Sequence, residues 1–332
     1  MQAHQRLRID DPSQVGDARR RAQLLSNELG LGEVVAGPVA LGVNELGNNL
    51  LRHAGGGELL LGPARGGVDL LSLDRGPGMD LARCLRDGYS TGGTAGTGLG
   101  AVKRLASEFS GFSLPGRGSV IATHFREGEP PEAPTKTFRI AGLAVAAPGE
   151  YVCGDAWGQR RLPGGQLALL LADGLGHGPD AAKASDTAVA GLQHASAGLL
   201  ASPSAALRQV HEALRSTRGA AASLVLVDAV AGRLLYSGAG NVVGRLVSGV
   251  SDRTLLSQHG TLGLQVRTLQ DIAYDWPAHA MLVLHSDGIA TRWNLSDVPG
   301  LLQCEPAVVA AWILRDHCRG RDDATVVVVQ LG

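Results

Sequence analysis

Acidic residues at four places in the second half of the chain have the surroundings that a divalent-cation site needs. Each stands beside a segment with the composition of a buried strand and has glycine or alanine next to it: Asp155, Asp173, Asp287 and the doublet Asp322-Asp323. Mg²⁺ and Mn²⁺ prefer oxygen ligands, and carboxylates at strand ends can converge on one point. A single Asp before Gly is often only a turn cap. Because an unpaired buried carboxylate is costly, the four places together indicate a two-cation centre that can present water as hydroxide to a phosphate.

A pair of polar residues in the first half could take part in nucleotide chemistry. Glu45 and Asn49 are four residues apart in a segment with helical character, so both side chains lie on one helix face. Taken alone, this pair is more typical of a solvated polar face. A nucleotide role needs support from other segments of the same half.

Two glycine-containing segments come after this pair in the order that a nucleotide pocket requires. Asp74 ends a predicted strand, where it could accept a hydrogen bond from an adenine amino group, and Gly76 and Gly78 allow a tight turn beside a ligand. The stretch 88–100 is rich in glycine and threonine and leads into a predicted helix, whose free N–H groups favour phosphate. With Glu45 and Asn49, these segments indicate an ATP site.

The elements that must position these residues form an α/β (α+β) pattern. In the first half we expect helices interleaved with mostly antiparallel strands. The expected strands are 5–9, 59–61, 68–73 and 119–125, and the expected helices are 14–29, 33–54, 80–87 and 99–108. In the second half we expect sheets with outer helices. The strands are placed near 138–153 and at 166–172, 222–227, 233–237, 280–285 and 325–331, and the helices at 179–197, 203–217 and 305–316.

Composition and length limit the class of protein. The 332 residues suit two domains. The segment 126–136 carries three prolines and three glutamates and reads as a linker, so we expect domains at 1–127 and 136–332 joined by 128–135. The net charge of −1 argues against a nucleic-acid partner. No CxxC pair, secretory signal or membrane-spanning apolar run is present, so we expect a cytoplasmic protein with no membrane partner.

The motifs of the first half resemble a known family. The series E-x-x-x-N, D-x-G-x-G and T-G-L-G resembles the Bergerat-fold ATP-binding domains, and the text Asp87-Gly-Tyr-Ser-Thr…Gly98-Leu-Gly-Ala-Val-Lys-Arg is most similar to the RsbT-like switch-protein serine kinases. The resemblance implies a Bergerat α/β sandwich over 1–127 that binds ATP with Mg²⁺. It implies that Asn49 holds the Mg²⁺, Glu45 acts as general base, and the nucleotide contacts come from Asp74, Gly76, Gly78, Thr97, Gly98 and Gly100. One departure is that the lid at 88–98 has no Arg or Lys to reach the γ-phosphate; Lys103 and Arg104 either substitute or face solvent.

The motifs of the second half resemble another family. Ala172-Asp-Gly-Leu-Gly-His-Gly178, Tyr236-Ser-Gly-Ala-Gly-Asn241 and Ser286-Asp-Gly-Ile289 are similar to the metal-dependent PPM-type (type 2C) serine/threonine phosphatases, most narrowly the SpoIIE/RsbX branch. The resemblance implies an αββα sandwich with two Mn²⁺ or Mg²⁺ ions. It implies that Asp155 and Asp173 bridge the ions and that the Gly174 carbonyl, Asp287 and Asp322 complete the shell, with Asp323 as second choice. No obvious general acid is present, and His177 either fills that role or only shapes its loop.

Taken together, the two resemblances imply a regulator that adds and removes phosphate on a serine or threonine of a STAS-domain protein. That partner would belong to an anti-sigma-factor or stressosome system. One alternative is a phosphatase whose ATP-binding domain only senses nucleotide or docks a partner. Another is an anti-sigma-like binding protein that the phosphatase resets. A homodimer is compatible with the sequence but has no specific support in it.

Overall fold

The computed structural model describes residues 3–64, 66–85, 98–128, 138–277 and 279–332. The chain divides into two compact units, residues 2–132 and 133–332. Of the expected linker at 128–135, only Gly128 is among the described residues. No helix within the described ranges is long and apolar enough to cross a membrane. Each unit is built around its own hydrophobic core.

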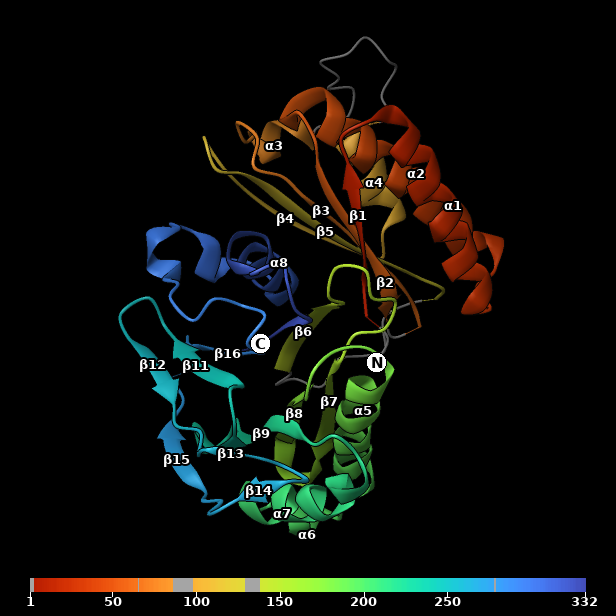
Figure 1. Ribbon diagram of the computed structural model, residues 1–332. Helices are drawn as coiled ribbons and strands as arrows, with labels where there is room; N and C mark the ends of the chain where they lie inside the picture. The colour runs from red at the N-terminus through yellow and green to blue at the C-terminus, as the bar shows by residue number, and fades with distance from the viewer. Residues whose placement is uncertain (1–2, 65, 86–97, 129–137, 278) are drawn as a thin grey trace. The chain divides into compact units, whose positions relative to one another are not determined.

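The first unit contains one antiparallel sheet (Figure 1). Its strands are β1 (Gln5–Ile9), β2 (Gly57–Ala64), β3 (Gly67–Leu73), β4 (Glu108–Leu114) and β5 (Gly118–Arg126), in the order β1-β2-β3-β5-β4. Strands β3 and β5 are neighbours, with Leu73 opposite Val120. The segments that follow β3 and precede β5 therefore meet at one end of the sheet.

Helices cover one face of this sheet. They are α1 (Pro12–Glu28), α2 (Glu33–Asn49), α3 (Leu81–Cys84) and α4 (Leu99–Leu105). Asp11 and Gln14 form a reciprocal capping box that fixes the start of α1. Val39, Val43 and Leu46 are fully buried along one stripe of α2, at the spacing of a helix face that packs on a sheet. This packing holds the polar end of α2 against the strands.

The first unit differs from the sequence expectation at two places. The helix expected over 33–54 is α-helical only to Asn49, because residues 50–54 form a π-helical turn that Gly55 closes in the left-handed conformation. The helix expected over 99–108 ends at Leu105, and the following strand β4 was not predicted. In β4, Phe109 and Phe112 are interspersed with serine and glycine, so the strand has little of the regular alternation by which such segments are found.

The second unit is a sandwich of two five-stranded antiparallel sheets. One has the order β15-β10-β9-β8-β7 and the other β12-β11-β16-β17-β6. The strands of the first are β7 (Asp155–Leu162), β8 (Gln166–Gly174), β9 (Ala220–Asp228), β10 (Arg233–Ala239) and β15 (Ile272–Asp275). Those of the second are β6 (Phe138–Val145), β11 (Val243–Val247), β12 (Asp252–Leu255), β16 (Met281–His285) and β17 (Ala324–Leu331). A short pair, β13 (Gly260–Thr261) and β14 (Gln265–Val266), lies beside them.

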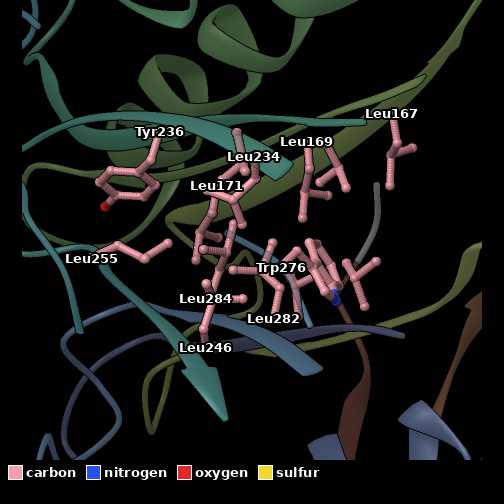
Figure 2. Close-up of a cluster of buried hydrophobic side chains, with 14 of the residues drawn as sticks. Leu167, Leu169, Leu171, Leu234, Tyr236, Leu246, Leu255, Trp276, Leu282 and Leu284 are labelled. Atoms are coloured by element: carbon pink, nitrogen blue, oxygen red, sulfur yellow. The ribbon is translucent and has the colours of Figure 1, made fainter. Parts of the chain in front are cut away.

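The core of the second unit lies between the two sheets (Figure 2). Leu169 and Leu171 of β8 and Leu234 of β10 face Leu282 and Leu284 of β16, and all five are buried. Alternate residues of β8 point the other way, into a second cluster under the helices. Strand β8 is therefore apolar on both faces, as its run of leucines and alanines predicts.

Helices form the outer layers of this unit. α5 (Pro179–His194) and α7 (Pro203–Ala213) pack on the sheet that contains β8, with the short α6 (Ala197–Leu200) beside α7, and α8 (Pro306–His317) packs on β17 and β6. The expected αββα arrangement is confirmed. The strands expected near 138–153 are a single strand that ends at Val145, and β7, β11, β12 and β15 were not predicted, because they are short or carry charged residues such as Arg160 and Arg245.

Candidate functional sites

A pocket in the first unit lies where the end of α2 meets the ends of β3 and β5. It is lined by Leu46, Asn49, Leu50, His53, Ala54, Ser72, Asp74, Pro77, Gly78, Met79, Leu99, Ser119 and Ile121. Asn49, Asp74 and Gly78 were all placed at a nucleotide site from the sequence, and the fold brings them together. Most of its lining is apolar, with a few polar side chains among them, a composition that suits a purine base.

Asn49 and Glu45 occupy different surroundings. Asn49 is the last residue of α2 and lines the pocket, where the chain passes into the π-helical turn. Glu45 lies one turn earlier, is half-buried, and is outside the described lining. Burial raises the pKa of Glu45, and the charge of Arg52 opposes that shift. A carboxylate with a raised pKa is a better proton acceptor, so its chemistry suits a general base.

The Asp74 segment is fixed by backbone contacts. Asp74 is buried, and its Oδ1 accepts a hydrogen bond from the Gly76 amide at 2.8 Å. A Cβ on Gly76 would lie 2.7 Å from Ala54 Cα, so this glycine allows the turn to approach the end of the π-helical segment. Gly78 has φ +78°, and a Cβ there would lie only 2.6 Å from Leu114 O, so this position also requires glycine. Gly78 lines the pocket, whereas Gly76, also expected there from the sequence, lies outside the described lining.

The phosphate end of the pocket is described only in part. Thr97 lies outside the described residues. Gly98 is the N-cap of α4, without a side-chain cap, and Gly100 lies in the first turn of that helix. The adjoining Leu99 lines the pocket, and Lys103 and Arg104 are exposed.

Two serines in the pocket were not singled out from the sequence. Ser72 of β3 and Ser119 of β5 are both buried and both line it. Ser119 Oγ lies 3.0 Å from Ser113 Oγ, which in turn accepts a hydrogen bond from the Met79 amide at 2.7 Å. No sequence signal marks these serines, because their role depends on the pairing of β3, β5 and β4.

The acidic residues of the second unit gather at one end of the sandwich. Asp155, at the start of β7, is directly opposite Asp173, near the end of β8. Asp287 follows β16, and Asp322 and Asp323 precede β17, the strand that pairs with β16. Like charges directly opposite on paired strands are destabilising. A cation bound between these carboxylates would offset their repulsion.

The carboxyl groups perturb one another's protonation. Burial is the largest cause that raises the pKa of Asp155, and the charges of Asp323 and Asp287 add to it, while the hydroxyls of Ser286 and Thr325 act in the opposite direction. Burial also raises the pKa of Asp173, with added contributions from the charges of Asp155, Asp287 and Asp322. Each group responds to charges from other strands, which shows that the acidic residues face a common space.

The doublet at β17 divides into two environments. Asp323 is buried, and its Oδ1 accepts a hydrogen bond from the Ala147 amide at 2.9 Å. Asp322 is exposed, its Oδ1 accepts a hydrogen bond from the Asp323 amide, and its charge raises the pKa of both Asp173 and Asp287. Asp323 thus holds the loop at Ala147 and keeps a buried Oδ2 without a hydrogen-bond partner, whereas the charge of Asp322 acts on Asp173 and Asp287.

The donor set fits hard divalent cations. Asp155 is 4% exposed, and its Oδ2 is buried with no hydrogen-bond partner, so a cation would satisfy it. Among the described residues, no three acidic, histidine or cysteine side chains converge tightly enough to form a ready-made cage. A Cβ on Gly174 would lie 2.1 Å from Ala181 O, so only glycine can place its backbone at this position.

Asn241 and His177, which both belong to motifs marked in the sequence, contact acidic side chains. Asn241, the last residue of the Tyr236–Asn241 motif, donates from Nδ2 to Asp287 Oδ2 at 2.5 Å. The sequence marked that motif but assigned no role to Asn241. His177 is exposed, and its Nδ1 lies 2.6 Å from Glu150 Oε1. It therefore stands at the rim of the centre in an ion-pair geometry with Glu150.

Comparisons with known proteins match a family to each unit. Residues 163–332 match the family model described as Stage II sporulation protein E (SpoIIE), and residues 10–123 match the one described as histidine kinase-like ATPase domain. The serine/threonine-protein kinase RsbT of Bacillus subtilis (strain 168) is 35% identical over 109 residues, which are 31% of this chain and 82% of that protein.

Solved structures are similar to part of the chain. A structure described under the bacterial stressosome, as a modular system adapted to control secondary messenger signaling, has 29% identity and a TM-score of 0.52. It covers 58% of this chain and 100% of its own. RsbX in complex with magnesium has 20% identity and a TM-score of 0.48, covering 60% of this chain and 98% of its own.

Proposed function

The chain belongs to the SpoIIE family of metal-dependent protein serine/threonine phosphatases and carries an RsbT-like kinase domain before it. On that premise, we propose that it both phosphorylates and dephosphorylates one partner protein. The partner is a STAS-domain protein of an anti-sigma-factor or stressosome system, and the modified residue is a serine or threonine. The observation that carries the proposal is that one chain holds a nucleotide pocket with Asn49 and Asp74 and, in its other unit, a carboxylate centre. RsbT is itself named a serine/threonine-protein kinase.

For the phosphatase reaction, Asp155, Asp173, Asp287, Asp322 and the Gly174 carbonyl would hold two Mn²⁺ or Mg²⁺ ions. When bound, the ions supply a water that is deprotonated near neutral pH. Asn241 keeps Asp287 oriented through its 2.5 Å hydrogen bond, and Asp323 holds the loop at Ala147 in place.

For the kinase reaction, Asn49 would hold Mg²⁺ on the ATP phosphates, and Asp74 would accept a hydrogen bond from the adenine amino group. Thr97, Gly98 and Gly100 would contact the phosphates. The γ-phosphoryl group passes to the substrate hydroxyl oxygen with ADP as leaving group, and Glu45 accepts the hydroxyl proton. Positioning supplies most of the rate in such reactions.

The alternative is a phosphatase whose first domain binds ATP without transferring phosphate. It is favoured by one sequence feature: the segment 88–98 contains no Arg or Lys. An anti-sigma-like binding protein is the third candidate. It predicts a stoichiometric, nucleotide-dependent complex without turnover.

Substitutions in the first domain discriminate these functions. Glu45→Ala and Asn49→Ala should each abolish phosphate transfer to the STAS protein and leave dephosphorylation of a phosphorylated STAS protein intact. If wild type transfers no phosphate, and Asn49→Ala only changes the nucleotide dependence of dephosphorylation, the first domain is a sensor. Glu33→Ala is the matched control, because Glu33 is exposed at the start of α2, at the opposite end of that helix from Asn49, and is outside the described pocket lining.

A further inference from the structure

An arginine stands beside the carboxylate centre of the second domain. Strands β8 and β9 are antiparallel, with Gly174 opposite Ala220. Beyond this pair, the Leu175 amide donates to Gly219 O at 3.0 Å. The residue before Gly219 is Arg218, which therefore lies against the loop that carries Asp173 and Gly174.

The side chain of Arg218 extends over this loop. Its Nη1 lies 3.5 Å from the point that a Cβ on Gly176 would occupy. Its Nη2 lies 2.8 Å from Asp180 Oδ2, in the first turn of α5. The Arg218 side chain is 51% exposed and that of Asp180 65%, so the ion pair is accessible to a substrate. An ion pair this exposed contributes little to stability and can be exchanged for another anion.

The charges at the carboxylate centre favour a positively charged side chain beside the substrate phosphate. Four carboxylates would be neutralised by two divalent cations. A phosphate monoester then brings close to two further negative charges, which the ligand set leaves uncompensated. A guanidinium is suited to this task because its planar donors can bind two phosphate oxygens at once.

We propose that Arg218 binds the phosphoryl group of the substrate at the phosphatase centre and that Asp180 holds it there before substrate arrives. The proposal rests on the phosphatase function proposed above and names the side chain that recognises its substrate class. Arg218 forms and breaks no covalent bond. It exchanges its contact with Asp180 for contacts with two phosphate oxygens.

A second arginine provides an internal comparison. The Arg319 amide donates to Gly288 O at 2.8 Å, which places Arg319 on the Asp287 side of the centre. Its side chain is exposed. Arg319 is therefore a second cation close to the same expected ligands, but it lies in the loop between α8 and β17.

The test measures binding of inorganic phosphate to the Mn²⁺-loaded full-length protein by titration calorimetry. Arg218→Ala should weaken phosphate binding at least about tenfold, as the loss of hydrogen bonds to a charged group predicts, and Arg218→Lys should restore part of it. Asp180→Asn should strengthen binding up to about fivefold, because the competing carboxylate is gone. Binding of Mn²⁺ alone should be the same in every variant.

Arg233→Ala is the matched control. Arg233 pairs with Asp275 at 3.7 Å, both side chains are exposed, and Arg233 lies opposite Asp228, at the far end of β9 from Ala220. Phosphate binding by this variant should equal that of wild type. The proposal is overturned if Arg218→Ala binds phosphate like wild type, or if Arg319→Ala loses as much affinity as Arg218→Ala.

Activity gives an independent readout on a phosphorylated STAS protein. Arg218→Ala should raise KM more than it lowers kcat, and Asp180→Asn should lower KM. If wild type binds phosphate through Arg218 but releases none from the phosphoprotein, the inference about Arg218 stands and the phosphatase proposal fails. The two results are therefore distinguishable.

Discussion

Replacing Asp173 with asparagine should stabilise the second domain when no metal is bound. Asp173 is directly opposite Asp155, and both carboxyls belong to the same acidic cluster. Asparagine has nearly the same shape but carries no charge. Asp173→Asn therefore removes the repulsion without opening a cavity.

The magnitude can be worked out from the register. Side chains directly opposite on paired strands stand roughly 5 Å apart, and two like charges at that distance repel by about 3 kcal/mol at an effective dielectric constant near 20. Burial raises the pKa of both carboxyls, and the charge of Asp155 raises that of Asp173 further. In the metal-free protein each raised pKa therefore lowers the stability of the fold by an amount that is near zero below the unfolded pKa, about 4, grows as pH rises above it, and levels off once pH exceeds the folded pKa. We expect a gain of about 1–3 kcal/mol at pH 8 and a smaller gain at pH 5.

Urea unfolding in EDTA, followed by tryptophan fluorescence, measures this gain. The four tryptophans, Trp157, Trp276, Trp293 and Trp312, all lie in the second unit, so the signal reports that domain alone. Asp186→Asn, an exposed position on α5, is the matched control and should change little. Excess Mn²⁺ should reverse the order of stability, because wild type binds the ions and Asp173→Asn has lost a ligand. A metal-free Asp173→Asn protein that is less stable than wild type at pH 8, or one whose gain is equal at pH 5, would refute the reasoning.

The nucleotide pocket and the carboxylate centre lead to three further predictions. Asp74→Asn should weaken ATP binding about tenfold or more, since the acceptor for the adenine amino group loses its charge; calorimetry on the full chain checks this, and unchanged affinity would remove Asp74 from the base site. Asn241→Ala should lower Mn²⁺ affinity about 10–100-fold, because Asp287 loses its orienting partner; a metal titration in which Asn241→Ala equals wild type contradicts it. The apparent Mn²⁺ affinity of wild type should rise with pH, because ligands with raised pKa values must release protons before binding; an affinity that is flat between pH 6 and 8 would mean that the carboxyls are already ionised.

The sequence could predict β8 and β17, two of the strands that present the acidic residues, because both are long and apolar. Leu167–Leu171 and Val326–Val329 are buried on both faces, and such runs stand out without any tertiary information. The glycine turns of the nucleotide pocket were also visible, because few residues except glycine tolerate φ values like that of Gly78. These signals are local, and a sequence carries local signals most clearly.

Pairwise contacts across the sheets could not be predicted in this way. That Asp155 stands opposite Asp173 depends on the register of β7, a strand whose charged residues hid it from the pattern. Asn241 reaches Asp287 only because β11, which comes directly after Asn241 and Val242, pairs with β16. For the same reason, the sequence could not decide which residue of the doublet Asp322-Asp323 is the metal ligand. Which of two adjacent carboxylates turns inward depends on the strand they precede and on the Ala147 amide.

The measurement that tests the central claim most directly uses purified protein, radiolabelled ATP, Mn²⁺ and the STAS protein encoded nearest to it. Wild type is compared with Asp173→Ala, which disables the phosphatase centre and leaves the first domain unchanged. Opposed activities on one residue predict that label accumulates on the STAS protein with Asp173→Ala and stays low with wild type. If Asp173→Ala gives no label while wild type still dephosphorylates the phosphorylated STAS protein, the first domain transfers no phosphate and the bifunctional account is wrong.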